Sequence, residues 1–225
     1  MVSAGTAPLP EATLLACKHR ILYTFGAMVS GARMRPGQMA AKYVRGLGRK
    51  PQASVIGTSF RTTTVNAALA NAMCPHSDET NDFEPVTKAH PGTSVVPSAL
   101  AMGEHLGQSG EAMIRAVALG YDLACRLLMA LRPDLVRGSN RSAEGTVSMF
   151  GSLGAAASLA RLEEVPMRYA LPYSLFYPLP AGELNDAIRI NCCLLANFLN
   201  LLTETSLAFC PSSGLCMLRF QFSSR

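Results

Sequence analysis

Four side chains that can move or hold a proton lie close together in one polar segment of the sequence. His76 and Asp78 stand at its start, Asp82 follows, and His90 stands near its end. The segment is rich in Asp, Glu, Thr, Asn and Pro and separates two apolar stretches, so we expect a loop that is exposed or lines a cleft. Imidazoles and carboxylates that the fold brings together can supply a general base, a general acid and hydrogen bonds to a carboxylate substrate.

Two other interpretations of this loop remain open. In the first, the loop is solvated, Asp78 and Asp82 cap helix ends, and His90 only precedes a turn. In the second, His76, Asp78 and His90 bind zinc. The chain has no dedicated pattern of zinc ligands, so we predict no metal site.

Helices are expected on both sides of the loop, because apolar residues recur at helical spacing. The expected helices span residues 11–29, 36–47, 64–73, 95–106, 111–131 and 146–162. Thr64 is expected to cap the third helix, and residues 53–57 are too short to be more than a strand or linker. Residues 132–145 are polar and predicted to be irregular. Sustained helix without alternating strands predicts an all-α domain.

The helix expected at residues 146–162 is rich in small side chains, among them Gly151 and Gly154. Small residues let two helix backbones approach closely, so this helix is expected to pack tightly on a neighbour.

The composition limits the class of partner. The chain has 225 residues and a formal charge of +5, with 49% hydrophobic and only 16% charged residues. Such an apolar balance suggests that part of the surface is covered by further packing. Lys and Arg fall singly and build no stripe that would follow a phosphate backbone, so we predict no nucleic-acid partner. A mildly basic protein suits a small polycarboxylate.

Seven cysteines show neither zinc spacing nor a C-x-x-C pair, and no secretory signal opens the chain. We therefore expect reduced thiols and an intracellular protein, in the cytoplasm or alternatively in mitochondria. The apolar run 188–209 contains Arg189 and Glu204, which are costly in a bilayer, so a buried or poorly ordered helix is favoured over a membrane span.

Three consecutive motifs resemble the signature region of the MmgE/PrpD family, which includes 2-methylcitrate dehydratase and cis-aconitate decarboxylase. They are an Ala-rich helix at residues 67–73, the acidic loop that starts at His76, and His90-Pro91-Gly92 opening the next helix. Similar collinear matches continue through Gly120-Tyr121-Asp122 and the small-residue helix to about residue 174.

The resemblance implies a multi-helix catalytic domain that acts as a cofactor-free lyase, usually as a homodimer. The substrates would be small tri- or polycarboxylates such as 2-methylcitrate or cis-aconitate, from which water or carbon dioxide leaves. Carried over to this chain, the catalytic residues are Asp78, Asp82 and His90, while His76 is a substrate-binding or structural residue.

The sequence departs from the family at two places. A second histidine is expected just before the Gly/Ala-rich helix, but the chain has Asn140 and Arg141 there, which are predicted to bind a substrate carboxylate instead. No match to the family is found after Ser174, where the α/β second domain would follow. We therefore divide the chain into a flexible lead-in (1–10), a truncated family-like helical domain (11–174) and a divergent tail (175–225).

The tail has the character of an altered reading frame, a retained intron or a wrong gene end. The alternative to an active lyase is therefore a catalytically inactive remnant that at most dimerises or binds a ligand.

Overall fold

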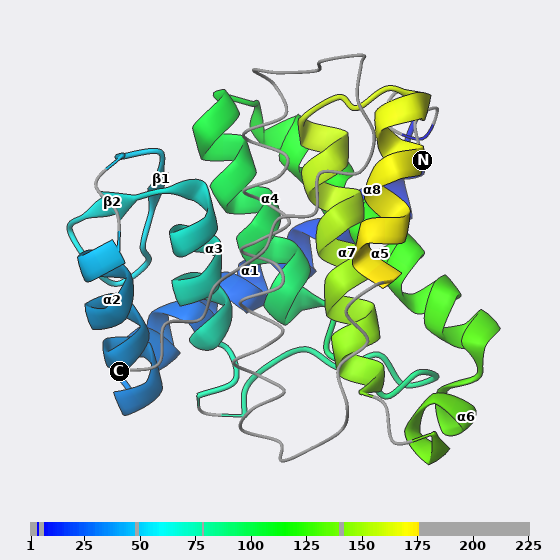
Figure 1. The fold of residues 1–225 in the computed structure, drawn as a ribbon, viewed down its shortest axis with the longest axis horizontal. Coiled ribbons are helices and arrows are strands. Elements are labelled where there is room, and N and C mark those ends of the chain that lie inside the picture. Colours follow the sequence, from blue (N-terminus) through cyan, green and yellow to red (C-terminus); the bar gives the residue numbers. More distant parts are fainter. Residues whose placement is uncertain (1–3, 5–6, 48–49, 78, 140–141, 176–225) are drawn as a thin grey trace, which may run out of the picture.

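The described part of the chain is an all-α assembly of helices with a small β-hairpin between α2 and α3, as shown in Figure 1. The computed structural model describes residues 4, 7–47, 50–77, 79–139 and 142–175. The helices are α1 (Glu11–Ala32), α2 (Arg35–Leu47), α3 (Thr64–Met73), α4 (Gly92–Leu106), α5 (Gly110–Leu131), α6 (Pro133–Gly138), α7 (Ala143–Leu159) and α8 (Glu164–Leu175). The strands are β1 (Ala53–Ser54) and β2 (Arg61–Thr62), which pair antiparallel. The all-α prediction is confirmed.

Helix starts follow the capping residues closely. Thr63, Ser109 and Ser142 each accept a hydrogen bond from the backbone N–H three residues later, at the first turns of α3, α5 and α7. Such bonds satisfy amide groups that have no partner inside the helix. The prediction that Thr64 is the cap of α3 is wrong by one residue, because the hydroxyl that points back to the helix is that of Thr63.

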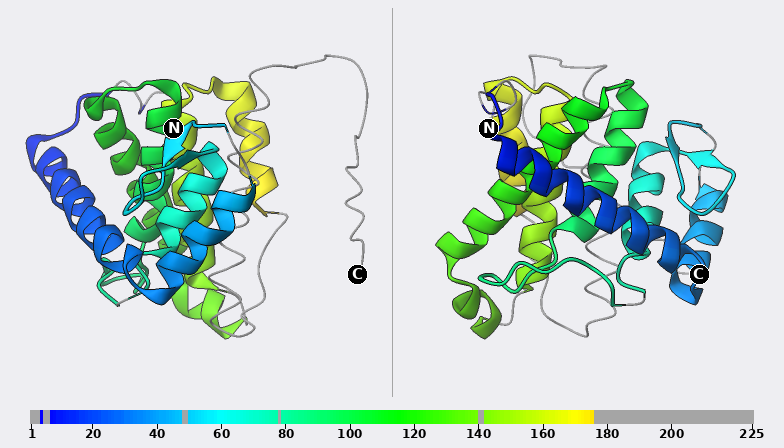
Figure 2. Two further views of the ribbon diagram at one scale, coloured as in Figure 1. Left: turned by 90° about the vertical axis from the view of Figure 1, so that its left-hand side faces the viewer. Right: turned by 180° about the vertical axis from the view of Figure 1, so that it is seen from behind.

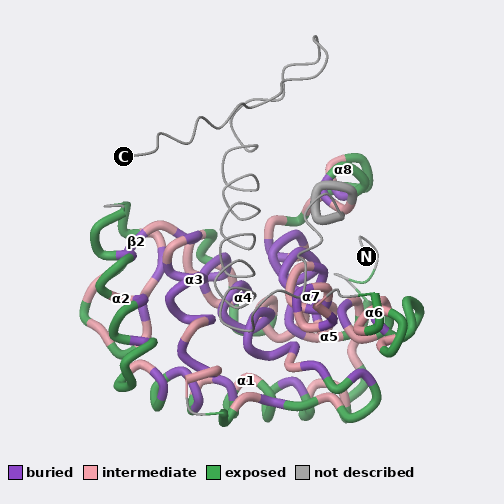
Figure 3. The backbone as a smooth tube through the Cα atoms, turned by 60° about the horizontal axis from the view of Figure 1, so that its bottom comes forward, coloured by how far each residue is buried: buried purple, intermediate pink, exposed green. Residues whose placement is uncertain are grey.

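Helix α4 is the buried centre of the fold. Val95, Val96, Ala99 and Met102 are at most 1% exposed, and α4 packs against α3, α5 and α7. Figure 3 shows the buried colour concentrated on α4 and α7, whereas α1 and α2 carry more exposed backbone.

The small-residue prediction for α7 is confirmed by how closely it meets α5. A Cβ added at Gly120 would lie 2.7 Å from the carbonyl oxygen of Gly151, and one added at Gly151 would lie 2.7 Å from a methyl group of Val95. No side chain larger than hydrogen fits at either position. The two helices therefore pack with backbone against backbone.

Two polar side chains, one buried and one half-buried, hold the β-hairpin against the helices. Asn71 of α3 donates to the carbonyl oxygen of Ser54 at 3.0 Å and accepts from the N–H of Ile56 at 2.9 Å. Glu104 of α4 accepts from the N–H of Ser54 at 2.5 Å. In Figure 2, the view from behind shows α1 crossing the whole back of the molecule from the α8 side to the α2 side.

Two further expectations need comment. Residues 132–145 are not wholly irregular, because Pro133–Gly138 form α6, with Pro133 at a first-turn position where its missing N–H is harmless. The expectations for the tail, including the apolar run 188–209, lie outside the described residues. No helix in the part of the chain that the structure describes is long and apolar enough to span a bilayer.

Candidate functional site

The loop between α3 and α4 is organised by short hydrogen bonds within itself. Glu84 and Ala89 form an isolated antiparallel bridge, and the Glu84 carboxylate accepts from the backbone N–H of Thr87 at 2.7 Å and from its hydroxyl at 2.5 Å. Burial raises the pKa of Glu84, but the hydrogen bonds from Thr87 and Val86 together with the charge of Arg20 outweigh it and lower the pKa below its ordinary value. The carboxylate thus keeps its charge and fixes the path of the loop just before His90.

Asp82 is a buried carboxylate whose two oxygens both have protein partners. One oxygen accepts from the N–H of Gly92 at 2.9 Å, at the start of α4, and the other accepts from the Tyr121 hydroxyl at 2.8 Å. The Arg20 guanidinium lies 4.0 Å away. Burial raises the pKa of Asp82, while these hydrogen bonds and Arg20 oppose the rise.

This arrangement explains why α4 begins at Gly92, earlier than the apolar pattern predicts. The Asp82 side chain caps the helix from ten residues upstream. A Cβ at Gly92 would lie 2.4 Å from the Tyr121 hydroxyl and 2.7 Å from the Asp82 oxygen, so only glycine fits there. The capping interpretation of Asp82 therefore describes its contacts.

His90 is held in one tautomer by the backbone of the same aspartate. Its Nδ1 lies 2.5 Å from the carbonyl oxygen of Asp82, and because a carbonyl can only accept, Nδ1 carries the proton. In the neutral ring Nε2 is then an unprotonated acceptor. The ring of Phe83 lies against His90, with centroids 5.8 Å apart.

His76 is held in the opposite tautomer. The amide nitrogen of Asn81 lies 2.9 Å from its Nδ1, and because that nitrogen can only donate, Nδ1 accepts and the proton of the neutral ring sits on Nε2. Burial lowers the pKa of His76, and a charge on His90 lowers it further, against smaller opposing effects of Glu79 and Glu144. His76 is therefore a neutral hydrogen-bond donor near pH 7.

The two imidazoles are neighbours. Their ring centroids lie 6.2 Å apart, and the planes are nearly perpendicular. One ring has a lone pair at Nε2 and the other has an N–H there, so the pair can supply both a base and a hydrogen-bond donor.

The start of α7 lies against the same loop. Arg137 of α6 donates to the carbonyl oxygen of Thr87 at 2.8 Å and to the Glu144 carboxylate at 3.3 Å. This link connects the loop to α6 and to the first turn of α7.

A pocket of about 380 Å³ lies on the other side of Asp82, between α1 and α5. Arg20 and Tyr121 line it together with Cys17 and small side chains. Neither His76 nor His90 lines this pocket. Burial raises the pKa of Cys17, which disfavours the reactive thiolate form.

The structure brings together three of the predicted site residues, His76, Asp82 and His90. Asp78, Asn140 and Arg141 lie outside the described residues. In the portion of the chain that is described, no three His, Cys, Asp or Glu side chains are grouped so as to hold a metal ion.

Sequence reasoning missed Tyr121 and Arg20 as partners of Asp82. Tyr121 is part of a matched motif, Gly120-Tyr121-Asp122, but nothing in that motif indicates a bond to a residue 39 positions away.

The helical frame that carries this loop corresponds to a known domain. A family model described as the MmgE/PrpD N-terminal domain matches residues 2–176. The chain belongs to the MmgE/PrpD family. A comparison with curated proteins finds no match. The match covers every helix described above, so the loop of His76 and His90 is part of an MmgE/PrpD domain.

Proposed function

We propose that this MmgE/PrpD domain serves a lyase of the dehydratase or decarboxylase type that acts on a small polycarboxylate such as 2-methylcitrate or cis-aconitate. The observation that carries the proposal is the pair of imidazoles with opposite tautomers, His90 with a free Nε2 and His76 with an Nε2 proton. Membership of the family supports the reaction class.

His90 would act as the proton-transfer group. In dehydration, its Nε2 takes the proton from the carbon beside a carboxylate and gives it to the departing hydroxyl, which leaves as water while the carbon–carbon double bond forms. In decarboxylation, the carbon–carbon bond to the leaving carboxylate breaks, and a protonated His90 supplies the proton to the remaining carbanion. Both reactions place an electron pair on carbon, which needs stabilisation nearby.

His76 would stabilise that charge. A neutral imidazole donates a hydrogen bond from Nε2 to a substrate carboxylate oxygen, and its lowered pKa keeps it in this form near neutral pH. It remains protonated throughout, so one group moves the proton and the other holds the charge.

The carboxylates and the segment before α7 have separate roles in the proposal. Asp82 is a positioning residue, because both of its oxygens are engaged and its carbonyl orients His90. Asp78 is proposed to orient a partner group or to assist in proton abstraction. Asn140 and Arg141 are proposed to bind a substrate carboxylate.

The test is an assay of the purified full chain for consumption of 2-methylcitrate and of cis-aconitate. His90→Gln is expected to lower turnover by about 10²–10⁴-fold, the usual contribution of a general base. His76→Gln is also expected to lower turnover, and its effect on substrate binding is expected to be smaller than its effect on turnover.

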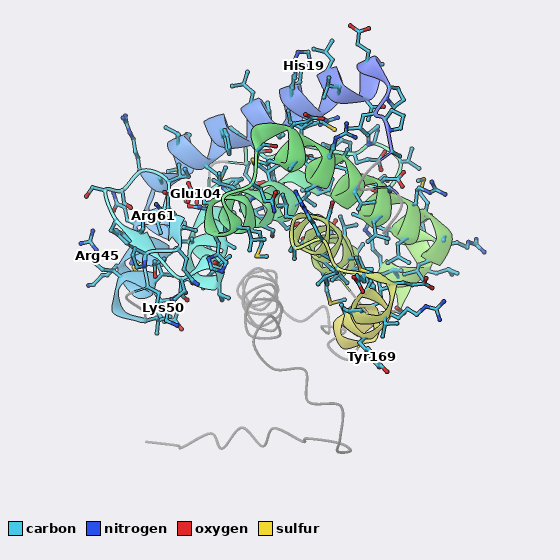
Figure 4. All side chains as sticks on the ribbon, turned by 90° about the horizontal axis from the view of Figure 1, so that it is seen from above. His19, Arg45, Lys50, Arg61, Glu104 and Tyr169 are labelled. Atoms are coloured by element: carbon cyan, nitrogen blue, oxygen red, sulfur yellow. The ribbon has the colours of Figure 1, made fainter. Side chains whose placement is uncertain are left out.

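His19→Gln is the matched control, because His19 lies on the exposed side of α1 (Figure 4). Folded protein that consumes neither substrate contradicts the proposal and favours an inactive remnant. Turnover that survives His90→Gln contradicts the assignment of the base.

We propose further that the domain forms a homodimer through α1. Leu15, Leu22 and Val29 are seven residues apart and 53%, 70% and 51% exposed, so they form one apolar stripe along the helix. Light scattering of the full chain tests this, because Leu22→Lys is expected to shift the mass toward the monomer. An unchanged dimer mass in that variant contradicts the placement of the interface.

A further inference from the structure

The positive charge of this protein is concentrated in one part of the chain. Between Glu11 and Asp78 the sequence has nine Lys and Arg residues and no Asp or Glu. Outside this basic segment, eleven basic residues face fifteen acidic ones, so the rest of the chain is negative. The modest net charge of +5 therefore hides a strongly basic region made of α1, α2, the hairpin and α3.

This region contains a pocket of about 420 Å³ between the end of α1, one face of α2 and the turn of the hairpin. It is lined by Ala32, Arg33, Gln38, Ala41, Lys42, Arg45, Gly57 and Thr58. All of its ionisable residues are cationic. Its volume lies in the range of pockets that hold small organic molecules.

The helical register of α2 explains why the cations converge. Gln38, Lys42 and Arg45 are spaced by four and three residues, so they share one face of the helix. Arg33 caps α1, and the Gln38 side chain donates to its carbonyl oxygen at 2.9 Å. The short connection between the helices thus sets Arg33 beside the cationic face of α2.

The opposite wall of the pocket is a fixed turn. Gly57 has φ +77°, and a Cβ there would lie 2.5 Å from the Cβ of Ala32, so the turn packs directly on the end of α1. The Thr58 hydroxyl donates to the carbonyl oxygen of Val55 at 2.8 Å, which closes the turn. The pocket is therefore part of the folded frame.

The three cations of the pocket have no anionic partner in the described structure. The arginines with carboxylate partners there are Arg20, Arg61, Arg115, Arg126, Arg137 and Arg168. Arg33, Lys42 and Arg45 are not among them. Glu104, which contacts the β-hairpin, is already engaged by the N–H of Ser54 and by Arg61.

Arg45 is in addition held in place. Its guanidinium lies 4.7 Å from the centroid of the Phe60 ring, a cation–π contact that limits the side chain's freedom without neutralising its charge. Figure 4 shows Arg45, Lys50 and Arg61 at the same end of the molecule, far from Tyr169 of α8. Like charges gathered without counter-charge repel one another, and a multivalent anion relieves that repulsion.

We propose that the pocket between α1, α2 and the hairpin turn binds a small organic anion with two or more phosphate or carboxylate groups. Arg33 and Arg45 bind anionic oxygens through their planar guanidinium groups, and Lys42 adds a point charge between them. Gln38 adds an uncharged amide. The site is separate from the loop of His76 and His90 and does not depend on the function proposed for that loop.

The two chemical sources of such an anion are distinguished by titrating the full chain with ADP and with citrate in a calorimeter at low salt, about 50 mM. We expect saturable binding of at least one of them, weakening as salt is raised. The variant Lys42→Gln/Arg45→Gln is expected to lose at least about tenfold in affinity, because each charge-assisted hydrogen bond contributes about 1.5–3 kcal/mol.

Lys18→Gln/Arg126→Gln is the matched control, since it removes the same charge from exposed positions on α1 and α5. We expect its affinity to stay within about twofold of the unchanged protein, because screened charges at a distance contribute little. His90→Gln is likewise expected to leave ADP binding unchanged, which separates the pocket from the proposed active site. Circular dichroism confirms that each variant is folded.

Stronger binding of ADP than of citrate identifies a phosphate ligand, and the reverse identifies a carboxylate ligand. Three results overturn the proposal: no binding of either anion, equal loss of affinity in the two double variants, or loss of citrate binding in His90→Gln with none in Lys42→Gln/Arg45→Gln. The last result would place the bound anion at the loop of His76 and His90.

Discussion

Replacing Tyr121 with phenylalanine removes one hydroxyl from the buried contact that joins α5 to the loop. That hydroxyl donates to Asp82 at 2.8 Å, and the Asp82 side chain is 1% exposed, so water does not replace the lost donor. Burial and the charge of Asp82 raise the pKa of Tyr121, so the hydroxyl is a donor at any ordinary pH. A hydrogen bond to a charged group contributes about 1.5–3 kcal/mol, and we expect Tyr121→Phe to lose that much unfolding free energy.

The pH dependence makes this prediction specific. The bond from Tyr121 lowers the pKa of Asp82 against the effect of burial, so Tyr121→Phe raises that pKa further. The full loss of unfolding free energy is therefore expected only at a pH where Asp82 is ionised. As pH falls and Asp82 becomes protonated in both proteins, the difference in unfolding free energy between Tyr121→Phe and the unchanged protein becomes smaller.

Urea unfolding followed by circular dichroism, near neutral pH and near pH 5, measures both effects. Tyr169→Phe is the matched control, because Tyr169 is 61% exposed on α8, and a change of at most about 0.5 kcal/mol is expected there. Equal losses in the two variants, or a Tyr121→Phe loss that does not vary with pH, would refute the role given to the contact.

Three further predictions follow from the packing and the charges. Gly151→Ala places a methyl 2.7 Å from Val95 of α4 and 3.1 Å from Ala124 of α5, and it is expected to cost about 1–3 kcal/mol of unfolding free energy. Gly26→Ala meets nothing within 4 Å and is expected to stabilise by about 0.5–1 kcal/mol. Thermal melting compares the two variants, and similar effects would contradict the close packing of α7 on α4 and α5. Asn71→Ala removes both side-chain hydrogen bonds to the hairpin and is expected to lower the free energy of unfolding by about 2 kcal/mol. The specific readout is faster hydrogen exchange of the hairpin amides, and unchanged exchange would contradict the role of Asn71. The pKa of His76 is below its ordinary value of 6.5, so as pH falls the unfolded chain takes up a proton before the folded chain does. The free energy of unfolding is therefore expected to decrease as pH drops below about 6.5. In His76→Gln the free energy of unfolding should depend less on pH, and an identical dependence would argue against a lowered pKa.

The family match gives these predictions a common frame. Residues 2–176 carry the MmgE/PrpD domain, and the segment from His76 to Gly92, which joins α3 to α4, contains both histidines. The variants above distinguish residues that support the fold from residues proposed to act in the reaction. Tyr121 and Gly151 test the support of the loop and of α4, whereas His76 and His90 test the chemistry itself.

The sequence by itself determined most of the helices and the place of the loop, because these depend on local patterns. Apolar spacing, Pro75 after α3 and the small residues of α7 are all visible without the fold. It also placed His76 and His90 in one polar segment, whereas only the structure shows that their rings are neighbours. The cap of α3 was misplaced because several neighbouring Thr residues could each serve as the cap. Helix α6 was missed because a short polar helix leaves only a weak pattern in the sequence.

Only the tertiary structure decided what the side chains of the loop contact. From its residue type and its place in the loop, Asp82 could be a catalytic carboxylate. Its two oxygens, however, accept hydrogen bonds from the Tyr121 hydroxyl, 39 residues later, and from the N–H of Gly92. The tautomers of His76 and His90 likewise depend on which backbone or amide group lies within hydrogen-bond distance. A sequence records which groups are present, whereas burial and hydrogen bonding between distant segments decide which of them hold the frame and which keep an atom free for chemistry.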